Sequence, residues 1–291
     1  MKQLTEKQLQ SYEENGFLII DDYFSKKELD DFSETLRRTI QAGLKSAAKK
    51  YPEIYYEDFI GKEFDEGIRK LEEVDHSYVA NIYDSIAFTP EFLRLISKPE
   101  TSTIVNQVLK KDPRSPLYTF SCRVRMVFPG KDRRYAGWHQ EVFYTIPHSR
   151  YLQTWAPLVR NATKENGTIV VCAGSHKENI ANQTWNGDPK SACPFVIKED
   201  IIRKYEHKDV EVKLGQFLIF SGYLIHKSGD NISNEVRYSL VGMHHDIDNP
   251  DFWAPTPRHE FKIKSPLAYY QEIFKINEAQ KDKVSGLGSQ K

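Results

Sequence analysis

The chain has 291 residues, with 41 Lys and Arg residues against 41 Asp and Glu residues. Balanced charge without a basic stripe argues against a nucleic-acid partner, and no apolar run is long enough to cross a membrane. The three cysteines are an odd number in unrelated contexts, which fits neither a disulfide framework nor a zinc site. The start of the chain lacks a signal-peptide core. We therefore expect a cytoplasmic protein with reduced thiols.

The N-terminal part, residues 1–115, is predicted to be mainly helical. Ser25 and Glu28 form a capping box, and Thr89 followed by Pro90 is typical of a helix start. Helices are expected over 6–15, 26–50, 76–88, 90–98 and 101–111, with a short strand at 17–20 and with 53–73 unassigned. This part is expected to support a β-rich core.

The core is predicted over residues 116–246, where apolar and polar residues alternate. In its first strand, Cys122, Val124 and Met126 share one face, and Arg123 and Arg125 share the other. Strands are expected over 117–128, 138–144, 151–159, 168–172, 210–212, 216–220, 224–227 and 236–245. Many short strands with regular turns are typical of a barrel or jelly roll.

Two further segments complete a chain that we interpret as one domain over 1–291. Residues 176–207 form a long insertion rich in Asn, Lys and Pro, and such loops are often lids. Residues 247–291 are expected to be a C-terminal cover with a short helix, followed by a polar tail. We find no internal repeat and no linker.

A candidate metal site begins at His139 and Glu141. On a strand over 138–144 these side chains would point the same way. They would supply two thirds of a 2-His-1-carboxylate site, which holds Fe(II) and leaves positions open for substrate and O₂. The pair is a weak signal by itself. His226 is the candidate third ligand, although a lone histidine on an apolar strand is more often a core residue.

The order and spacing of several motifs resemble a known family. His226 lies in a His-x-Ser-Gly-x-Asn context, and Arg237 follows eleven residues later. The segment 166–177 contains Asn-Gly and Gly-Ser-His, and the opening 4–20 adds to the pattern. Together with His-x-Glu, these motifs resemble the phytanoyl-CoA dioxygenase family of Fe(II)- and 2-oxoglutarate-dependent oxygenases, from near the N-terminus to about residue 246.

The resemblance implies an α+β fold with a double-stranded β-helix, a jelly-roll or cupin-like barrel, and N-terminal helices packed on one sheet. It implies an oxygenase that uses Fe(II), 2-oxoglutarate and O₂ to oxidise, most often to hydroxylate, a small-molecule metabolite, with succinate and CO₂ as co-products. The metal ligands are then His139, Glu141 and His226. We expect a monomer or a homodimer.

Four more residues have expected roles at the site. Arg237 lies on a strand that we expect to run beside the strand of His226. It suits a two-pronged contact with the far carboxylate of 2-oxoglutarate, although an internal salt bridge is the alternative. Ser228 shares the face of His226 and could donate to the same carboxylate. Trp155 is expected to line the pocket, or to be a core residue, and Gln153 shares its face.

The sequence departs from the family pattern at one metal ligand, and two other interpretations of the chain are possible. The usual carboxylate of the family is Asp, and here it is Glu141, which argues against the halogenating branch because a carboxylate is present. A non-enzymatic jelly-roll binding module would make His139 and Glu141 ordinary strand residues. An oxo-acid-independent metal enzyme of the cupin type would leave Arg237 unexplained.

Overall fold

The computed structural model describes residues 3–130, 136–143, 145–146, 149–178, 181, 183–185, 195–250 and 252. One compact unit spans Met1–Phe252. The predicted C-terminal helix and tail lie outside the described residues, so the single domain over 1–291 stays a prediction. Among the helices that are described, none is both long enough and apolar enough to cross a membrane.

The N-terminal part is helical, as predicted. Its elements are α1 (Glu6–Asn15), α2 (Lys26–Ala48), the 3-10 helix η1 (Tyr56–Phe59), the π-helix η2 (Glu63–Gly67), α3 (Ile68–Val74), α4 (His76–Ile86), α5 (Pro90–Ile96) and α6 (Pro99–Val108). Reciprocal capping boxes begin α1 at Thr5 and α2 at Ser25, because each cap side chain and the side chain three residues later satisfy otherwise unpaired amides.

The strands form antiparallel sheets. The five-stranded sheet has the order β1 (Phe17–Ile20), β8 (Phe217–Ser221), β3 (Tyr151–Pro157), β10 (Arg237–Asp246) and β2 (Leu117–Val127). The three-stranded sheet has the order β7 (His207–Val210), β4 (Ile169–Cys172) and β9 (His226–Ser228). A third sheet pairs β5 (Gln183–Trp185) with β6 (Phe195–Ile197).

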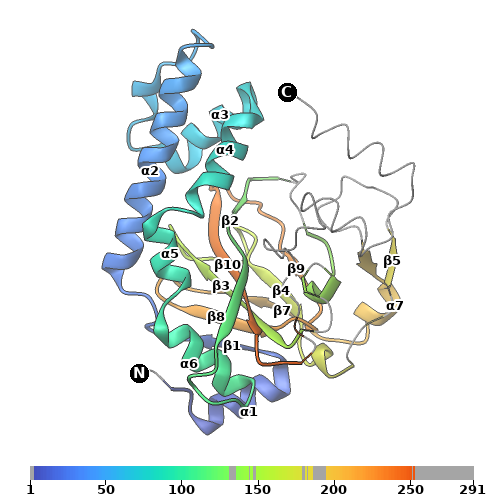
Figure 1. The fold of residues 1–291 in the computed structure, drawn as a ribbon. Coiled ribbons are helices and arrows are strands. Elements are labelled where there is room, and N and C mark those ends of the chain that lie inside the picture. The colour runs from blue at the N-terminus through green and yellow to red at the C-terminus, as the bar shows by residue number, and fades with distance from the viewer. Residues whose placement is uncertain are drawn as a thin grey trace, which may run out of the picture. The chain divides into compact units, whose positions relative to one another are not determined.

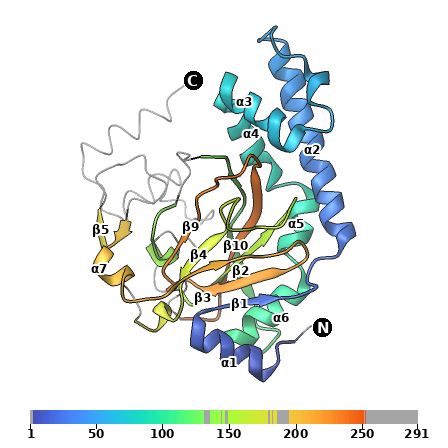
Figure 2. The same cartoon turned by 180° about the vertical axis from the view of Figure 1, so that it is seen from behind.

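The helices cover the five-stranded sheet (Figure 1 and, from behind, Figure 2), and they share a core with it. The expected alternation in β2 explains how. Val124 and Met126 are buried in the core that includes α2 and α4. Arg123 and Arg125, on the opposite face, line a cavity. The prediction of N-terminal helices packed on one sheet is therefore confirmed.

The insertion over 176–207 contains more regular structure than expected. It includes part of a 3-10 helix, η4 (Ser175–Glu178), the β5–β6 pair and a short helix, α7 (Glu199–Ile202), while 179–180, 182 and 186–194 lie outside the described residues. The next strand, β7, begins at residue 207 rather than at 210. A lid function for this segment stays a prediction.

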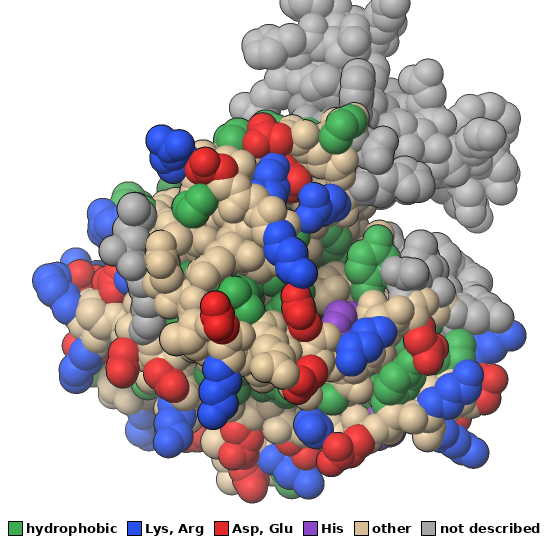
Figure 3. All heavy atoms as spheres, turned by 90° about the horizontal axis from the view of Figure 1, so that it is seen from below, with side chains coloured by type: hydrophobic (Ala, Val, Ile, Leu, Met, Phe, Trp, Pro, Cys, Tyr) green, Lys and Arg blue, Asp and Glu red, His purple; other side chains and the backbone are tan. Residues whose placement is uncertain are grey.

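The surface carries charges of both signs. On the face in Figure 3, acidic and basic side chains are interspersed. Opposite charges also pair along helices, such as Lys26 with Asp30 and Lys27 with Asp31 on α2. Such exposed pairs contribute little to stability. Because the charges are mixed, their distribution does not single out a functional region on the face in Figure 3.

Candidate active site

A cavity of about 140 Å³ is lined by residues from the two larger sheets. Its lining includes every residue predicted for the site: His139, Glu141, Gln153, Trp155, His226, Ser228 and Arg237. These residues come from segments almost a hundred positions apart in the chain. The fold therefore brings all the residues predicted for the site together around one cavity.

Three side chains bring metal-binding atoms together in this cavity. One ligand atom each from His139, Glu141 and His226 lies within 4.8 Å of the others. Oε2 of Glu141 is 3.4 Å from Nε2 of His139 and 3.8 Å from Nε2 of His226. All three residues are buried. Two imidazoles and one carboxylate are the donor set of non-haem iron sites.

Backbone hydrogen bonds determine which nitrogen of each imidazole faces the carboxylate. Nδ1 of His139 donates to the carbonyl oxygen of Gly137 at 2.7 Å, and Nδ1 of His226 donates to that of Leu224 at 2.9 Å. The Nε2 lone pairs then face Glu141, which also offers lone pairs. Lone pairs that face one another repel unless a cation lies between them. The residues present therefore fit a divalent metal ion, and the backbone carbonyls orient the imidazole ligands.

The electrostatics of the cavity favour the metal-binding forms of these groups. Burial lowers the pKa of His226 to about 3, so its imidazole is neutral at pH 7. Burial alone would raise the pKa of Glu141, but the adjacent His139 and the charge of Arg123 lower it to about 2. A neutral imidazole and an ionised carboxylate are the forms that bind a metal.

The predicted strand over 138–144 is wrong. Only His139 pairs there, in an isolated bridge to β9, and the chain then enters the 3-10 helix η3 (Glu141–Phe143). The side chain of Gln140 accounts for the bend. Its amide donates to the carbonyl of Tyr223 at 2.6 Å and accepts from the backbone amide of Ala181 at 2.9 Å. The carboxylate therefore reaches the imidazoles from a turn and not from a strand.

Arg237 begins β10 and is only 2% exposed. Nη1 donates to Oγ of Ser239 at 3.2 Å, Cζ lies 5.1 Å from the centroid of the Trp155 ring, and Nε has no hydrogen-bond partner. Burial, followed by the charge of Arg125, lowers the pKa of Arg237 to about 9, so it is still a cation at pH 7. Within the described part of the chain it forms no salt bridge, and a buried cation of this kind requires an anion.

The strand of Arg237 was expected to run beside the strand of His226, and this expectation is wrong. β10 pairs with β2 and β3, whereas β9 pairs with β4 in the other sheet. The two side chains nevertheless line the same cavity, because they approach it from different sheets.

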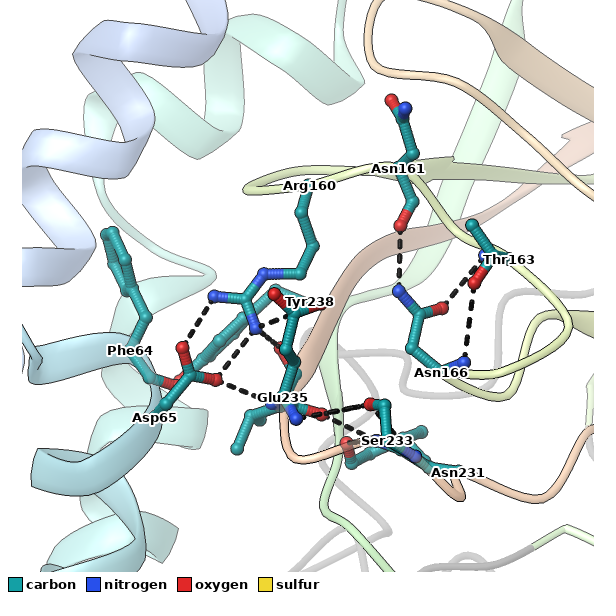
Figure 4. Close-up of polar contacts among 12 residues, drawn as sticks. Phe64, Asp65, Arg160, Asn161, Thr163, Asn166, Asn231, Ser233, Glu235 and Tyr238 are labelled. Atoms are coloured by element: carbon teal, nitrogen blue, oxygen red, sulfur yellow. Dashed lines mark hydrogen bonds and ion pairs between the residues drawn. The ribbon is translucent and has the colours of Figure 1, made fainter.

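The helical layer anchors the start of β10 (Figure 4). Asp65, in the π-helix η2, makes a two-pronged ion pair with Arg160, at 2.7 and 2.8 Å, and accepts the backbone amide of Val236 at 2.7 Å. The hydroxyl of Tyr238 donates to a backbone carbonyl of the same π-helix at 2.7 Å. These contacts hold the residues on either side of Arg237, so they position its backbone. The π-helix that provides them is a kind of turn that is frequent at functional sites.

Two motif segments meet next to this anchor and shape the backbone. Asn166 and Asn231 form an isolated bridge, and the Asn231 side chain also donates to a carbonyl at the end of β2 at 3.0 Å. Gly167 has φ +80°, and a Cβ there would lie 2.7 Å from the carbonyl oxygen of Gly229. Only glycine allows this approach. These motif residues therefore hold the end of β9 against its neighbours.

The remaining predicted residues surround the metal ligands. Nε2 of Gln153 donates to Oε2 of Glu141 at 3.3 Å, while Oε1 of Gln153 is buried without a partner. Trp155 lies two residues further along β3, on the same face. Ser228 lies on β9, two residues beyond His226. Gln153 therefore orients the carboxylate, and Trp155 packs against Arg237 from the side of β3.

Arg123 and Arg125 were not predicted as site residues, although the alternation of β2 placed them on one face. Both are half-buried and line the cavity, opposite Val241 and Ser239 of β10 in the strand register. Phe220 was also missed, and its ring lies 5.0 Å from that of His226. The alternation in the sequence showed that the two arginines share a face of the strand, but it could not show that this face lines the cavity.

Comparison with solved structures shows the same fold in non-haem enzymes. The epimerase SnoN, in complex with Fe³⁺, alpha-ketoglutarate and nogalamycin RO, matches with a TM-score of 0.55 at 15% identity, over 83% of each chain. EctD from S. alaskensis, with 2-oxoglutarate and 5-hydroxyectoine, matches with a TM-score of 0.55 at 17% identity, over 84% of this chain and 77% of the other. The fold and the buried 2-His-1-carboxylate donor set are those of a non-haem metal enzyme.

The sequence comparison is more specific. Residues 12–239 match the family described as Phytanoyl-CoA dioxygenase (PhyH). The curated protein "Phytanoyl-CoA dioxygenase 1" of Oryza sativa subsp. japonica is 21% identical over 270 residues, which cover 81% of this chain and 87% of the relative. The chain belongs to the phytanoyl-CoA dioxygenase family. This confirms the family predicted from the sequence, and with it an oxidoreductase of the iron- and 2-oxoglutarate-dependent class.

Proposed function

We propose that the protein uses Fe(II), O₂ and 2-oxoglutarate to hydroxylate a small-molecule metabolite, with succinate and CO₂ as co-products. The observation that carries this proposal is one cavity that contains both a cluster of metal ligands and a buried arginine suited to a dicarboxylate. Family membership supports the class of enzyme. Among solved structures of the same fold, SnoN contains Fe³⁺ and alpha-ketoglutarate, and EctD contains 2-oxoglutarate.

Three residues would hold the metal. His139 and His226 would bind through Nε2, because their Nδ1 atoms donate to backbone carbonyls. Glu141 would bind through Oε2, which lies nearest to both imidazoles. Gln153 would keep that carboxylate oriented through its amide. When bound, the metal would activate O₂, the oxidant of the reaction, while 2-oxoglutarate would supply two electrons on conversion to succinate and CO₂.

Three further residues would hold 2-oxoglutarate. The guanidinium of Arg237 has an Nε–H without a partner and would bind the far carboxylate with two parallel hydrogen bonds. Ser228 lines the cavity from the facing sheet and would donate to the same carboxylate. Trp155 packs against the guanidinium, which limits its orientations and keeps water from it.

We also infer that the two larger sheets form a double-stranded β-helix. Consecutive strands β8, β9 and β10 alternate between the five-stranded and the three-stranded sheet, as winding around a common axis requires. The shared cavity between these sheets supports this inference. A monomer or homodimer and a cytoplasmic location stay predictions.

Anaerobic titration of 2-oxoglutarate into the Fe(II) protein tests the proposal. A metal-to-ligand charge-transfer band should appear and saturate, and iron-dependent succinate formation should follow when O₂ is admitted. Iron binding without the band would favour the oxo-acid-independent metal enzyme. Absence of iron binding would favour the non-enzymatic jelly roll and would contradict the assigned ligands.

A further inference from the structure

Cationic side chains outnumber anionic ones among the described residues that line the cavity. Among its described lining residues, Arg123, Arg125 and Arg237 are cationic and point in from the five-stranded sheet, while Glu141 is the one carboxylate. Lys227 also lines the cavity, but its ammonium lies over the Trp138 ring, 5.3 Å from the centroid. The lining is therefore strongly cationic.

The proposed function uses only some of the charged residues of the cavity. Glu141 is assigned to the metal and Arg237 to 2-oxoglutarate, whereas Arg123 and Arg125, which also line the cavity, have no role in holding either group. Guanidinium groups that are half-buried at a cavity can bind an anionic ligand there through charge-assisted hydrogen bonds.

The position of Arg123 and Arg125 separates them from the co-substrate. The guanidinium of Arg237 leans toward β3, since it packs over Trp155. Arg123 and Arg125 come from β2, on the other side of β10 and at the edge of the five-stranded sheet. They therefore face the cavity from the edge strand of this sheet, on the side away from Trp155. Both arginines also interact with other groups of the chain, but each guanidinium has five N–H donors.

Resting on the proposed function, we propose that the substrate carries an oxyanion, a carboxylate or a phosphate, and that Arg123 and Arg125 bind it. The two side chains leave the same face of β2 two residues apart. Planar guanidinium groups at this spacing can contact one oxyanion from two directions. Binding at this point would place the rest of the substrate over the metal ligands, because Arg123 also acts electrostatically on Glu141.

The test uses the full chain loaded anaerobically with Fe(II) and 2-oxoglutarate, with inorganic phosphate and acetate as separate probes. Calorimetry measures the binding of each probe, and the charge-transfer band reports 2-oxoglutarate in the same samples. Wild-type protein should bind at least one probe while the band persists. The probe that binds more tightly identifies a phosphate or a carboxylate site. Arg123→Gln and Arg125→Gln should each weaken that binding at least about tenfold, since each removes charge-assisted hydrogen bonds.

Matched variants make the result specific. Arg114→Gln removes the same charge from a side chain that is 90% exposed, and it should leave probe binding unchanged. Arg123→Lys and Arg125→Lys keep the charge and should recover part of the affinity. The inference is overturned if the wild-type protein binds neither probe at millimolar concentration, if the Gln variants bind as tightly as wild type, or if the probes displace 2-oxoglutarate. Loss of the band before any probe is added would instead contradict the proposed function.

Discussion

Replacing Arg237 with Ala tests the co-substrate site most directly. A buried, charge-assisted pair is worth about 2–5 kcal/mol when one partner is truncated. Arg237 is 2% exposed, so water cannot replace the guanidinium well. The lower limit, ~2 kcal/mol, corresponds to about a 30-fold rise in the half-saturating concentration of 2-oxoglutarate. Arg237→Lys should recover only part of the loss, because an ammonium cannot form a two-pronged contact.

The assay is the anaerobic titration of 2-oxoglutarate followed by the charge-transfer band. Iron binding to the free protein is the internal control, and it should barely change, because Arg237 is not among the clustered metal-binding residues. Unchanged affinity for 2-oxoglutarate in Arg237→Ala would refute the assignment. The fold and the metal ligands would survive that result, but the co-substrate would need another site.

The variant Arg237→Met separates a clamp from a structural salt bridge. In the free protein the cation has no salt bridge within the described residues, and replacing a buried ion with an apolar side chain is often neutral or stabilising. The midpoint of thermal unfolding should therefore stay near that of wild type. A fall of more than about 4 °C, roughly 1 kcal/mol or more for a protein of this size, would indicate a structural role.

The other predictions concern the ligands, the anchor of β10 and pH. His226→Ala should abolish iron binding in the 2-oxoglutarate complex and all turnover, and normal 2-oxoglutarate consumption would exclude it as a ligand. Glu141→Asp should retain some turnover, whereas Glu141→Gln should retain almost none, so equal activity of the two would count against a metal-bound carboxylate. Asp65→Asn should raise the KM for 2-oxoglutarate about fivefold, for ~1 kcal/mol, with kcat little changed. An unaltered KM would show that the ion pair with Arg160 does not position β10. Below the pKa of Arg237, about 9, wild-type affinity for 2-oxoglutarate should be independent of this group, and above it affinity should fall about tenfold per pH unit because binding must then take up a proton. Constant affinity up to about pH 10 would disprove this linkage.

Local signals predicted the longer helices and most strands well, but they missed α3 and α7. The capping box at Ser25 and the start at Thr89 depend on neighbours within three residues, and both helices begin where predicted. Alternation in β2 also gave the correct faces. These features are encoded within short windows of sequence, so they can be read before the tertiary structure is known.

The same reasoning failed where distant contacts decide the backbone. The composition around Glu141 favours a strand, but Gln140 binds backbone groups 83 and 41 residues away and accompanies a turn. The prediction that β9 and β10 lie side by side was wrong for a related reason. Consecutive strands are usually neighbours, whereas here they lie in different sheets. Nothing in a local window indicates that change of sheet.

The residues that carry the family resemblance are of two kinds: some bring metal-binding atoms together, and others fix the backbone near the site. His139, Glu141 and His226 bring the metal-binding atoms together. Asn231 and Gly167 instead hold the backbone near β9, through side-chain hydrogen bonds and a close approach that only glycine permits. Both tasks constrain residue type strictly, so both produce recognisable motifs.

Arg123 and Arg125 follow a different rule. Their place in an alternating strand restricts them only to a face, and that face becomes informative once β2 lies beside β10 at the edge of the cavity. Chemistry common to the family therefore resides in its motifs, while the charge that we propose to select a substrate resides in ordinary strand positions. The next experiment on specificity should therefore vary this pair and leave the ligands of the metal intact.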